Sequence, residues 1–392
     1  MKPASLHFCT SEAWGGLELY ACTLMEALKE SGFPVFAVCR KESKTWKRLR
    51  ASRIETVHLP SASPVSLSTR RFLREFIRQQ EIAALHVHFH SDVWHASLAV
   101  RDTPEKRLIV GVYMGVSSKN DILHRWIFRR IDAVVTSSSE LCRKLPSVYP
   151  VDAGRIQFLP YGRRIEEYRV DEAKRREIRL RHGVGPDELL AGTFLRIDPD
   201  KGVMDFAGSY RYIEPPPGQS VKFMIVGEPT RKARVRGNES PFEEHSEAFL
   251  REVERYISDN GLSSRIILTG FQDDLVGYLS AMDVFVFPSR NELYSLAVLD
   301  AMGMGLPVLA SRAGGNIEQI DEQSTGMFFE VANSKDLAVK LSAYLRDAGL
   351  RASRGAGARR FVAEHHDMKL TVRRLQELYS PGGASSQSPL IP

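Results

Sequence analysis

The feature that most constrains this chain is a repeated alternation of short apolar runs with amphipathic stretches. Such alternation is typical of parallel sheets whose strands are joined by crossover helices. In the first half, the predicted strands are Leu6–Thr10, Pro34–Arg40, Ala84–Phe89, Leu108–Tyr113, Ala133–Ser137 and Ile156–Leu159. Predicted helices between them include Leu17–Glu30, Thr69–Gln79 and Ile122–Arg130.

The same pattern starts again after the turn at residues 159–162 and the charged stretch Asp171–His182. The strands predicted there are Leu189–Leu195, Lys222–Val226, Ile266–Thr269, Val284–Phe287, Pro307–Ala310 and Met327–Phe329, with helices at Phe242–Ser258 and Tyr294–Met302. The sequence therefore predicts an α/β protein of two doubly wound, Rossmann-like domains. Ligands of such sheets bind outside the carboxyl ends of the strands, so we expect the two domains to face a central cleft.

The expected domain boundaries follow from these patterns. Residues 1–165 form the first predicted domain and residues 166–365 the second, and a helix within 366–380 is expected to cross back to the first. Residues 230–241 are expected to be a mobile loop. The tail, residues 381–392, is rich in Pro, Gly and Ser and is expected to be disordered.

The charge distribution and composition limit the partners and the location. Residues 1–150 carry 22 Lys and Arg against 14 Asp and Glu, whereas the remaining residues carry 32 against 34. No nucleic-acid-binding signature accompanies the basic half, so we expect no nucleic acid as partner. Two interpretations of the basic half remain: it binds an anionic membrane surface, or it is simply a solvated surface. The sequence shows no apolar leader, no spanning run of about 20 residues and no paired-cysteine spacing, which favours a cytoplasmic protein.

A helix predicted at Thr69–Gln79 bears on the membrane question. Its apolar side chains repeat at helical spacing and arginines flank them: Phe72, Leu73, Phe76 and Ile77 beside Arg70, Arg71, Arg74 and Arg78. Such a helix either packs on its own sheet or docks at a membrane interface. In the second case the protein would be peripheral on the inner membrane face.

The stretch from residue 287 to residue 308 carries the strongest chemical signal. An apolar strand ends at Pro288, a polar turn follows, and a helix is expected to open near Leu293. Backbone amides at such a helix start favour an anion. Glu292 and Asp300 would lie roughly 12 Å apart along the axis if both were helical, which suits an elongated polyhydroxylated ligand. The alternative is a Glu that favours the helix dipole and an ordinary exposed Asp.

This stretch resembles the signature of the retaining GT-B glycosyltransferases of family 4, Pro-Ser-x-x-Glu-x-Phe-Gly-x-x-x-x-Glu-Ala-Met-x-x-Gly-x-Pro-Val. Tyr294 stands in place of the Phe, Ser295 in place of the Gly and Asp300 in place of the second Glu. Residues 313–318, Ala-Gly-Gly-Asn-Ile-Glu, are similar to the Gly-Gly-x-x-Glu of the same family.

Two further stretches agree with this resemblance. Residues 192–202 are similar to the family's Gly-Arg-x-x-x-x-Lys-Gly, which places Arg196 and Lys201 in one loop where they can neutralise a diphosphate. Gly15 and Gly16 follow the first strand, as the family's Gly-Gly loop does. The resemblance implies Glu292, Arg196 and Lys201 as catalytic residues. It implies a donor-binding set of Gly15, Gly16, Gly227, Leu293, Tyr294, Ser295, Leu296 and Asp300.

The acceptor side is expected at the carboxyl ends of strands in the first domain. His90 is expected to reach the cleft, and Met114 stands where the family often has a His. His86, His88 and His90 alternate along one predicted strand, so a metal site is conceivable. We expect none, because the family needs no metal, and we interpret His86 and His88 as core residues.

The resemblance implies a retaining, metal-independent hexosyltransferase that needs no cofactor beyond its nucleotide-sugar substrate, UDP- or GDP-linked. The hexose would pass with an α-linkage to a carbohydrate or glycolipid acceptor, as in lipopolysaccharide synthesis. Two alternatives stay open: a nucleotide-sugar epimerase on the same fold, and a catalytically weakened nucleotide-sugar-binding relic.

Overall fold

The computed structural model describes residues 4–232 and 240–380, and the chain divides into two compact units. The first unit runs to Gly162 and resumes at His366, and the second comprises Arg163–His365. The expected boundaries were after residues 165 and 365, and the observed ones are after Gly162 and His365. The expected disordered tail and most of the expected mobile loop lie outside the described residues, although Arg231 and Phe242 pair at the base of that loop.

Within the described residues, the first unit is built on a seven-stranded, fully parallel sheet of order β3-β2-β1-β4-β5-β6-β7. Its strands are β1 (Ala4–Cys9), β2 (Val35–Cys39), β3 (Glu55–Val57), β4 (Ile82–Val87), β5 (Arg107–Gly111), β6 (Ala133–Thr136) and β7 (Ile156–Phe158). All six predicted strands are present, with ends that differ by at most two residues. The short edge strand β3 was not predicted, because its Glu-Thr-Val sequence carries little apolar signal.

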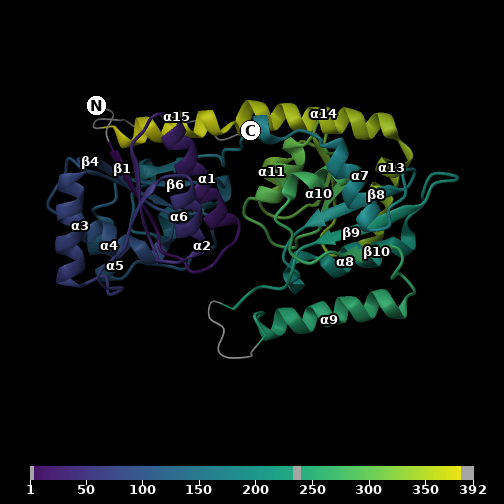
Figure 1. The fold of residues 1–392 in the computed structure, drawn as a ribbon, viewed down its shortest axis with the longest axis horizontal. Helices are drawn as coiled ribbons and strands as arrows, with labels where there is room; N and C mark the ends of the chain where they lie inside the picture. Colours follow the sequence, from purple (N-terminus) through teal and green to yellow (C-terminus); the bar gives the residue numbers. More distant parts are fainter. Residues whose placement is uncertain (1–3, 233–239, 381–392) are drawn as a thin grey trace. The chain divides into compact units, whose positions relative to one another are not determined.

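Helices join the parallel strands of this unit. They are α1 (Gly16–Glu30), α2 (Lys44–Ala51), α3 (Leu67–Gln79), α4 (Val93–Ala99), α5 (Ile122–Phe128), α6 (Ser139–Val148) and α15 (Met368–Tyr379). Helix α1 contacts α2 and α15, whereas α4 contacts α3 and α5. Figure 1 shows α15, in yellow, beside the purple α1, so the end of the described chain completes the first unit.

Within its described residues, the second unit holds a six-stranded parallel sheet of order β10-β9-β8-β11-β12-β13. Its strands are β8 (Leu189–Phe194), β9 (Val221–Val226), β10 (Ile266–Leu268), β11 (Val284–Phe287), β12 (Val308–Ser311) and β13 (Gly326–Phe329). Its helices are α7 (Glu172–Arg181), α8 (Val203–Ser209), α9 (Glu244–Asp259), α10 (Leu275–Ala281), α11 (Leu296–Gly303), α12 (Asn316–Gln319), α13 (Ser334–Arg346) and α14 (Ala348–His365).

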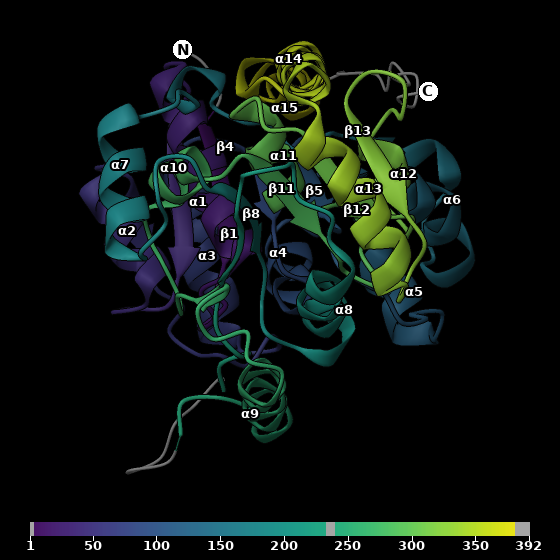
Figure 2. The same ribbon diagram turned by 90° about the vertical axis from the view of Figure 1, so that its right-hand side faces the viewer.

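The core of the second unit fills the space between this sheet and one layer of helices. Side chains of α8, α9 and α13, such as Phe206, Val253 and Leu341, pack against buried strand residues such as Phe223 and Val286. Figure 2 shows α8 and α13 side by side in this layer. Elsewhere in the unit, α7 contacts α10 and α11 contacts α14. Both sheets are doubly wound, so the chain connections diverge in opposite directions between β1 and β4 and between β8 and β11.

Candidate functional site

The loops after β8 and β11 meet at the point where the second sheet's connections diverge. Lys201 ends a single 3-10 turn (Pro199–Lys201) after β8, and Glu292 lies in the loop after β11. Lys201 Nζ lies 3.3 Å from Glu292 Oε2 and 3.4 Å from Ser289 Oγ. Two residues predicted as catalytic, 91 positions apart in the sequence, are therefore in direct contact.

Glycines allow the backbones around Glu292 to approach closely. Gly202 has a φ of +67°, and a Cβ there would lie 2.0 Å from the carbonyl oxygen of Pro288. Gly314 has a φ of +44°, and its Cβ would lie 2.0 Å from the Glu292 carbonyl oxygen, which also accepts a 2.8 Å hydrogen bond from the Gly315 amide. The glycines of both motifs therefore fix where Glu292 sits.

Arg196 follows β8, and its side chain is 60% exposed. Its Nη1 donates to Thr230 Oγ1 at 2.9 Å and lies 3.7 Å from Asp198 Oδ2. Gly227, a predicted donor-binding residue, has a φ of +150°, and a Cβ there would lie 1.8 Å from the Leu195 carbonyl oxygen. Gly227 is thus needed for the close packing of the backbone from which Arg196 extends.

Helix α11 begins at Leu296, later than the predicted start near Leu293. Ser295 is the N-cap, and its Oγ accepts from the Val298 amide at 3.3 Å. Gln319 fixes this cap from α12, because its Oε1 accepts from the Ser295 amide at 2.8 Å and its Nε2 donates to the Ser295 carbonyl at 2.7 Å. The Ser that replaces the family's Gly therefore caps the helix, and no sequence motif pointed to Gln319.

This later start changes where several of the predicted site residues lie. Glu292 lies in the loop, so the expected separation of Glu292 and Asp300 along one helix is wrong. Leu293 shares that loop and is half-buried, Tyr294 is buried, and Leu296 is the first helical residue.

Asp300 lies inside the second unit and is 8% exposed. Its Oδ1 lies 2.7 Å from Arg163 Nε and accepts a 2.5 Å hydrogen bond from the Tyr168 hydroxyl. Burial raises the pKa of the Asp300 carboxyl, while the Arg163 charge and the Tyr168 hydrogen bond oppose that rise. The expected ribose ligand is thus held by an internal ion pair. Arg163 and Tyr168 lie more than 130 positions away, and no motif marks them.

The glycine loop of the first unit follows β1, and α1 begins at Gly16. Glu18 Oε2 accepts from the Gly15 amide at 2.9 Å, and Oε1 accepts from Ser11 Oγ at 2.7 Å. Glu18 is buried, and its carboxylate accepts the hydrogen bond of one backbone amide at this helix start.

A pocket of about 180 Å³ opens in the first unit beyond β4 and β5, and both predicted acceptor-side residues line it. Met114 is 59% exposed there. His90 accepts from or donates to the Tyr149 hydroxyl at 3.2 Å. Burial lowers the pKa of His90 to about 4, and the charges of Lys119 and His124 add to this effect.

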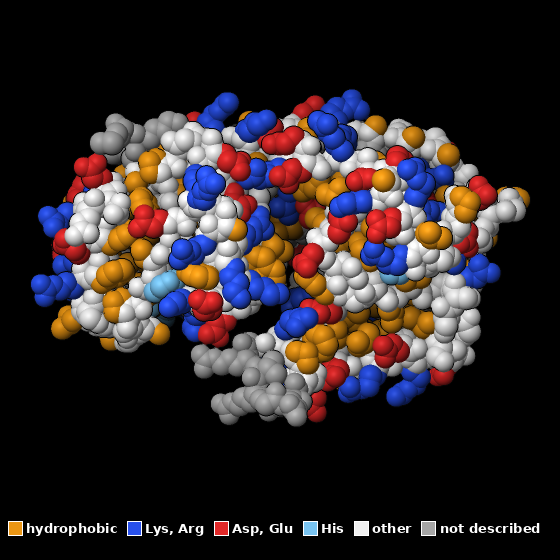
Figure 3. Space-filling model, in the orientation of Figure 1, with side chains coloured by type: hydrophobic (Ala, Val, Ile, Leu, Met, Phe, Trp, Pro, Cys, Tyr) orange, Lys and Arg blue, Asp and Glu red, His pale blue; other side chains and the backbone are white. Residues whose placement is uncertain are grey.

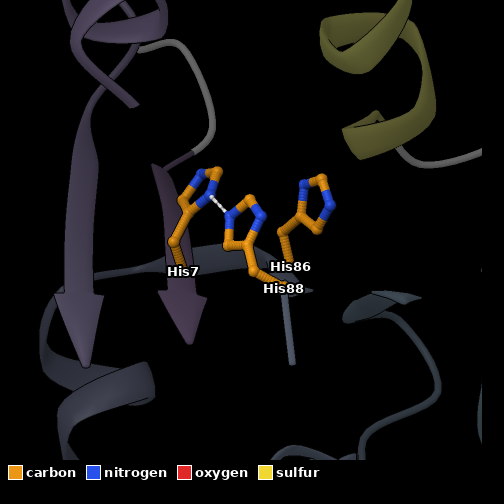
Figure 4. Close-up of side chains that lie close together, drawn as sticks. All are labelled: His7, His86 and His88. Atoms are coloured by element: carbon orange, nitrogen blue, oxygen red, sulfur yellow. Dashed lines mark hydrogen bonds between the residues drawn. The ribbon is translucent and has the colours of Figure 1, made fainter. Parts of the chain in front are cut away.

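The three alternating histidines do not share one strand. Strand β4 ends at Val87, His88 follows it, and His90 opens a 3-10 turn (His90–Asp92). His90 is therefore not part of the group that His86 and His88 form. The third histidine of that group is His7 of β1 (Figure 4).

Helix α3 packs on its own unit. Leu73, Phe76 and Ile77 are buried, and Phe72 is half-buried. Arg70 and Arg74 both pair with Asp102. The packing alternative for this helix is thus the correct one. On the face drawn in Figure 3, Lys and Arg side chains are interspersed with acidic ones. None of the helices within residues 4–232 and 240–380 has the length and apolar character that crossing a bilayer requires.

Two doubly wound units, one with a Lys–Glu pair where its strand connections diverge, define the chain as a GT-B protein. Comparisons with known families agree with this class. Residues 188–347 match the family model described as Glycosyl transferases group 1, and residues 14–167 match Glycosyltransferase Family 4. The two models together match most of the chain, which belongs to the family 4 glycosyltransferases.

Relatives and solved structures extend the comparison. The chain is similar to D-inositol 3-phosphate glycosyltransferase of Nocardia farcinica, with 27% identity over 66% of this chain and 52% of that protein. It is also similar to the lipopolysaccharide core biosynthesis mannosyltransferase LpsB of Rhizobium meliloti, with 24% identity over 73% and 78% of the two chains. The match thus spans about half the length of the first relative, and about three fifths of several others.

Among solved structures, Anabaena Alr3699/HepE in complex with UDP and glucose aligns with a TM-score of 0.76. The alignment covers 96% of this chain and 98% of that one at 17% identity. At that identity the likeness shows the fold alone.

Proposed function

We propose that the protein is a retaining glycosyltransferase that moves a hexose from a nucleotide sugar to a carbohydrate or glycolipid acceptor, with an α-linkage. The observation that carries this proposal is the contact between Lys201 and Glu292 where the loops after β8 and β11 meet. Ligands of doubly wound sheets bind at this place. The relatives named as glycosyltransferases and the neighbour solved with UDP and glucose support the same substrate class.

Lys201 and Arg196 are proposed to stabilise the leaving diphosphate. As the bond between the anomeric carbon and the donor phosphate breaks, negative charge develops on the diphosphate. Lys201 supplies a point charge and Arg196 a planar fork, which together stabilise that charge without a metal ion. Glu292 accepts hydrogen bonds from hexose hydroxyls, and the acceptor proton passes to the donor's own phosphate. A UDP- or GDP-linked donor is favoured.

The acceptor is expected at the pocket of the first unit, beside His90 and Met114. We further propose that a lipid-linked acceptor reaches it from an anionic membrane. Because the apolar stripe of α3 is buried, this contact is assigned to α5, where Ile122 is 84% and Leu123 62% exposed beside Arg125 and Arg129. The basic excess of residues 1–150 is complementary to anionic lipid.

A donor screen with two variants tests the proposed transfer. UDP-, GDP- and ADP-sugars are first ranked by thermal shift, and turnover is then followed with acceptor present and absent. Glu292→Ala and Lys201→Ala should each lower turnover about a hundredfold, or about 3 kcal/mol, because each removes one charged or polar contact to the transition state. Asp187→Ala, an exposed acidic residue of the same unit, is the control and should keep full turnover.

The outcomes separate the proposed function from its alternatives. Epimerised donor without acceptor would indicate an epimerase, and donor binding without any turnover would indicate a binding relic, which the internal pairing of Asp300 favours. Wild-type turnover in both site variants would refute the site assignment.

A further inference from the structure

Three histidines lie together on one face of the first unit's sheet, whereas the Lys201–Glu292 site belongs to the second unit. His7 of β1 is opposite His86 of β4 in the parallel register. The His88 amide donates to the Phe8 carbonyl oxygen at 3.0 Å, which keeps the chain beside β1 past the end of β4. Side chains two residues apart share a face, so all three imidazoles extend to the same side (Figure 4). We name these residues the histidine cluster.

The histidine cluster is buried, and His88 also lines the pocket that holds His90 and Met114. His7 and His86 have no exposed surface, and His88 is 2% exposed. Tyr379 of α15 covers the cluster, and its hydroxyl lies 2.6 Å from His86 Nδ1. Burial lowers the pKa of His88 to about 3 and the pKa values of His7 and His86 well below their usual range.

The hydrogen bonds of the histidine cluster are incomplete. His7 Nδ1 and His88 Nε2 are 3.0 Å apart and share one proton, and His7 Nε2 lies 3.2 Å from Ser5 Oγ. Among the described groups, His86 Nε2 and His88 Nδ1 have no hydrogen-bond partner. A buried polar atom without a partner costs about 1–3 kcal/mol, so packing alone does not account for three histidines at this place.

We propose that the histidine cluster binds one zinc ion. One ring nitrogen from each histidine lies within 4.8 Å of the other two. Tetrahedral zinc with metal–nitrogen bonds of about 2.0–2.1 Å requires nitrogens about 3.3 Å apart. The His7–His88 pair is already within a few tenths of an ångström of that separation. The third ligand would be His86 Nε2, which has no hydrogen-bond partner among the described groups, while His86 Nδ1 stays bonded to Tyr379.

The histidine cluster would supply three of the four ligands of a tetrahedral zinc ion, and a water molecule from the pocket beside His88 would supply the fourth. The three ligands are imidazole nitrogens, which favour zinc and its neighbours in the transition series over magnesium or calcium. Tyr379 and Ser5 each contact a second nitrogen of a ligand ring, the outer-shell arrangement that orients metal-bound histidines. The bound ion would join β1 and β4 beneath α15. This zinc ion is separate from the proposed transfer chemistry, which needs none.

The test counts zinc in the refolded protein. The full chain is unfolded with chelator, refolded with one equivalent of zinc chloride, washed with chelator at neutral pH and measured by atomic emission. The wild type should retain about one zinc per chain. His86→Gln and His88→Gln should each retain less than 0.1. His182→Gln, which alters a histidine bonded to Tyr278 in the second unit, should retain the full amount.

A second measurement covers variants that fold poorly. Cobalt chloride in place of zinc should give the visible absorption of tetrahedral cobalt in the wild type. Zinc present during refolding should raise the melting temperature of the wild type by several degrees. Less than 0.1 zinc per wild-type chain, or equal retention in wild type and a folded His86→Gln/His88→Gln double variant, would overturn the proposal.

Discussion

Replacing Asp300 with alanine should destabilise the second unit much more than a surface substitution does. The Asp300 and Arg163 side chains are only 12% and 10% exposed, and their charged atoms are 2.7 Å apart. Removal of the carboxylate leaves the Arg163 charge buried without its acidic partner and the Tyr168 hydroxyl without this acceptor. Breaking a buried pair in this way costs about 3–5 kcal/mol, a large part of the 5–15 kcal/mol that stabilises a typical domain.

The assay is urea unfolding followed by circular dichroism, on Asp300→Ala, Arg163→Met and the double variant. Removal of both charges eliminates the buried guanidinium that has lost Asp300, so the double variant should recover a substantial part of the lost free energy of unfolding. Asp300→Glu adds one methylene to an enclosed carboxylate and should cost about 1–3 kcal/mol. Asp187→Ala, which truncates an exposed carboxylate, should stay within about 0.5 kcal/mol of the wild type.

The opposite result would assign Asp300 to the donor site. If Asp300→Ala unfolds within about 0.5 kcal/mol of the wild type and binds nucleotide sugar more weakly, the internal pairing does not stabilise the fold. The carboxylate would then have the ribose-binding role that the sequence motif implies.

Two further predictions concern the first unit. Because the pKa of His88 is about 3 when folded and about 6.5 when unfolded, the metal-free protein should lose stability as pH falls below 6.5. At pH 5 the protonation of His88 alone should lower the free energy of unfolding by about 2 kcal/mol. Urea unfolding at pH 7.5 and pH 5 should therefore show a smaller loss of stability for His88→Gln than for the wild type. An equal loss in both proteins would contradict this prediction. Ile122→Ser/Leu123→Ser should reduce co-sedimentation with anionic vesicles, whereas Arg70→Gln/Arg74→Gln, which alters only the Asp102-paired arginines of α3, should have less effect. Equal binding by both double variants would remove α5 as the contact.

Local pattern was sufficient to predict the two sheets. Parallel strands that are buried on both faces need continuous apolar runs, and the connecting helices need a 3.6-residue period, so both signals lie within short windows of sequence. The edge strand β3 was missed for the same reason, since three residues with one apolar side chain carry no periodic signal. The sequence also placed Lys201 and Glu292 in loops that follow strands, where the structure has them, because each belongs to a recognisable motif at a strand end.

Contacts between distant segments were decided by the tertiary structure. The sequence placed His90 with His86 and His88 by alternation, but the strand ends at Val87 and pairing with β1 brings in His7 from 79 residues away. In the same way, Arg163 engages Asp300 and Gln319 fixes Ser295.

The sequence by itself thus determined the alternation of strands and helices, the doubly wound class and the loops that carry the charged motif residues. Only the tertiary structure decided which side chains are already engaged inside the protein and which extend from the loops. The physical reason is range: helix and strand periodicity is a property of neighbouring residues, whereas burial, ion pairing and pKa depend on segments that meet only when the sheets assemble.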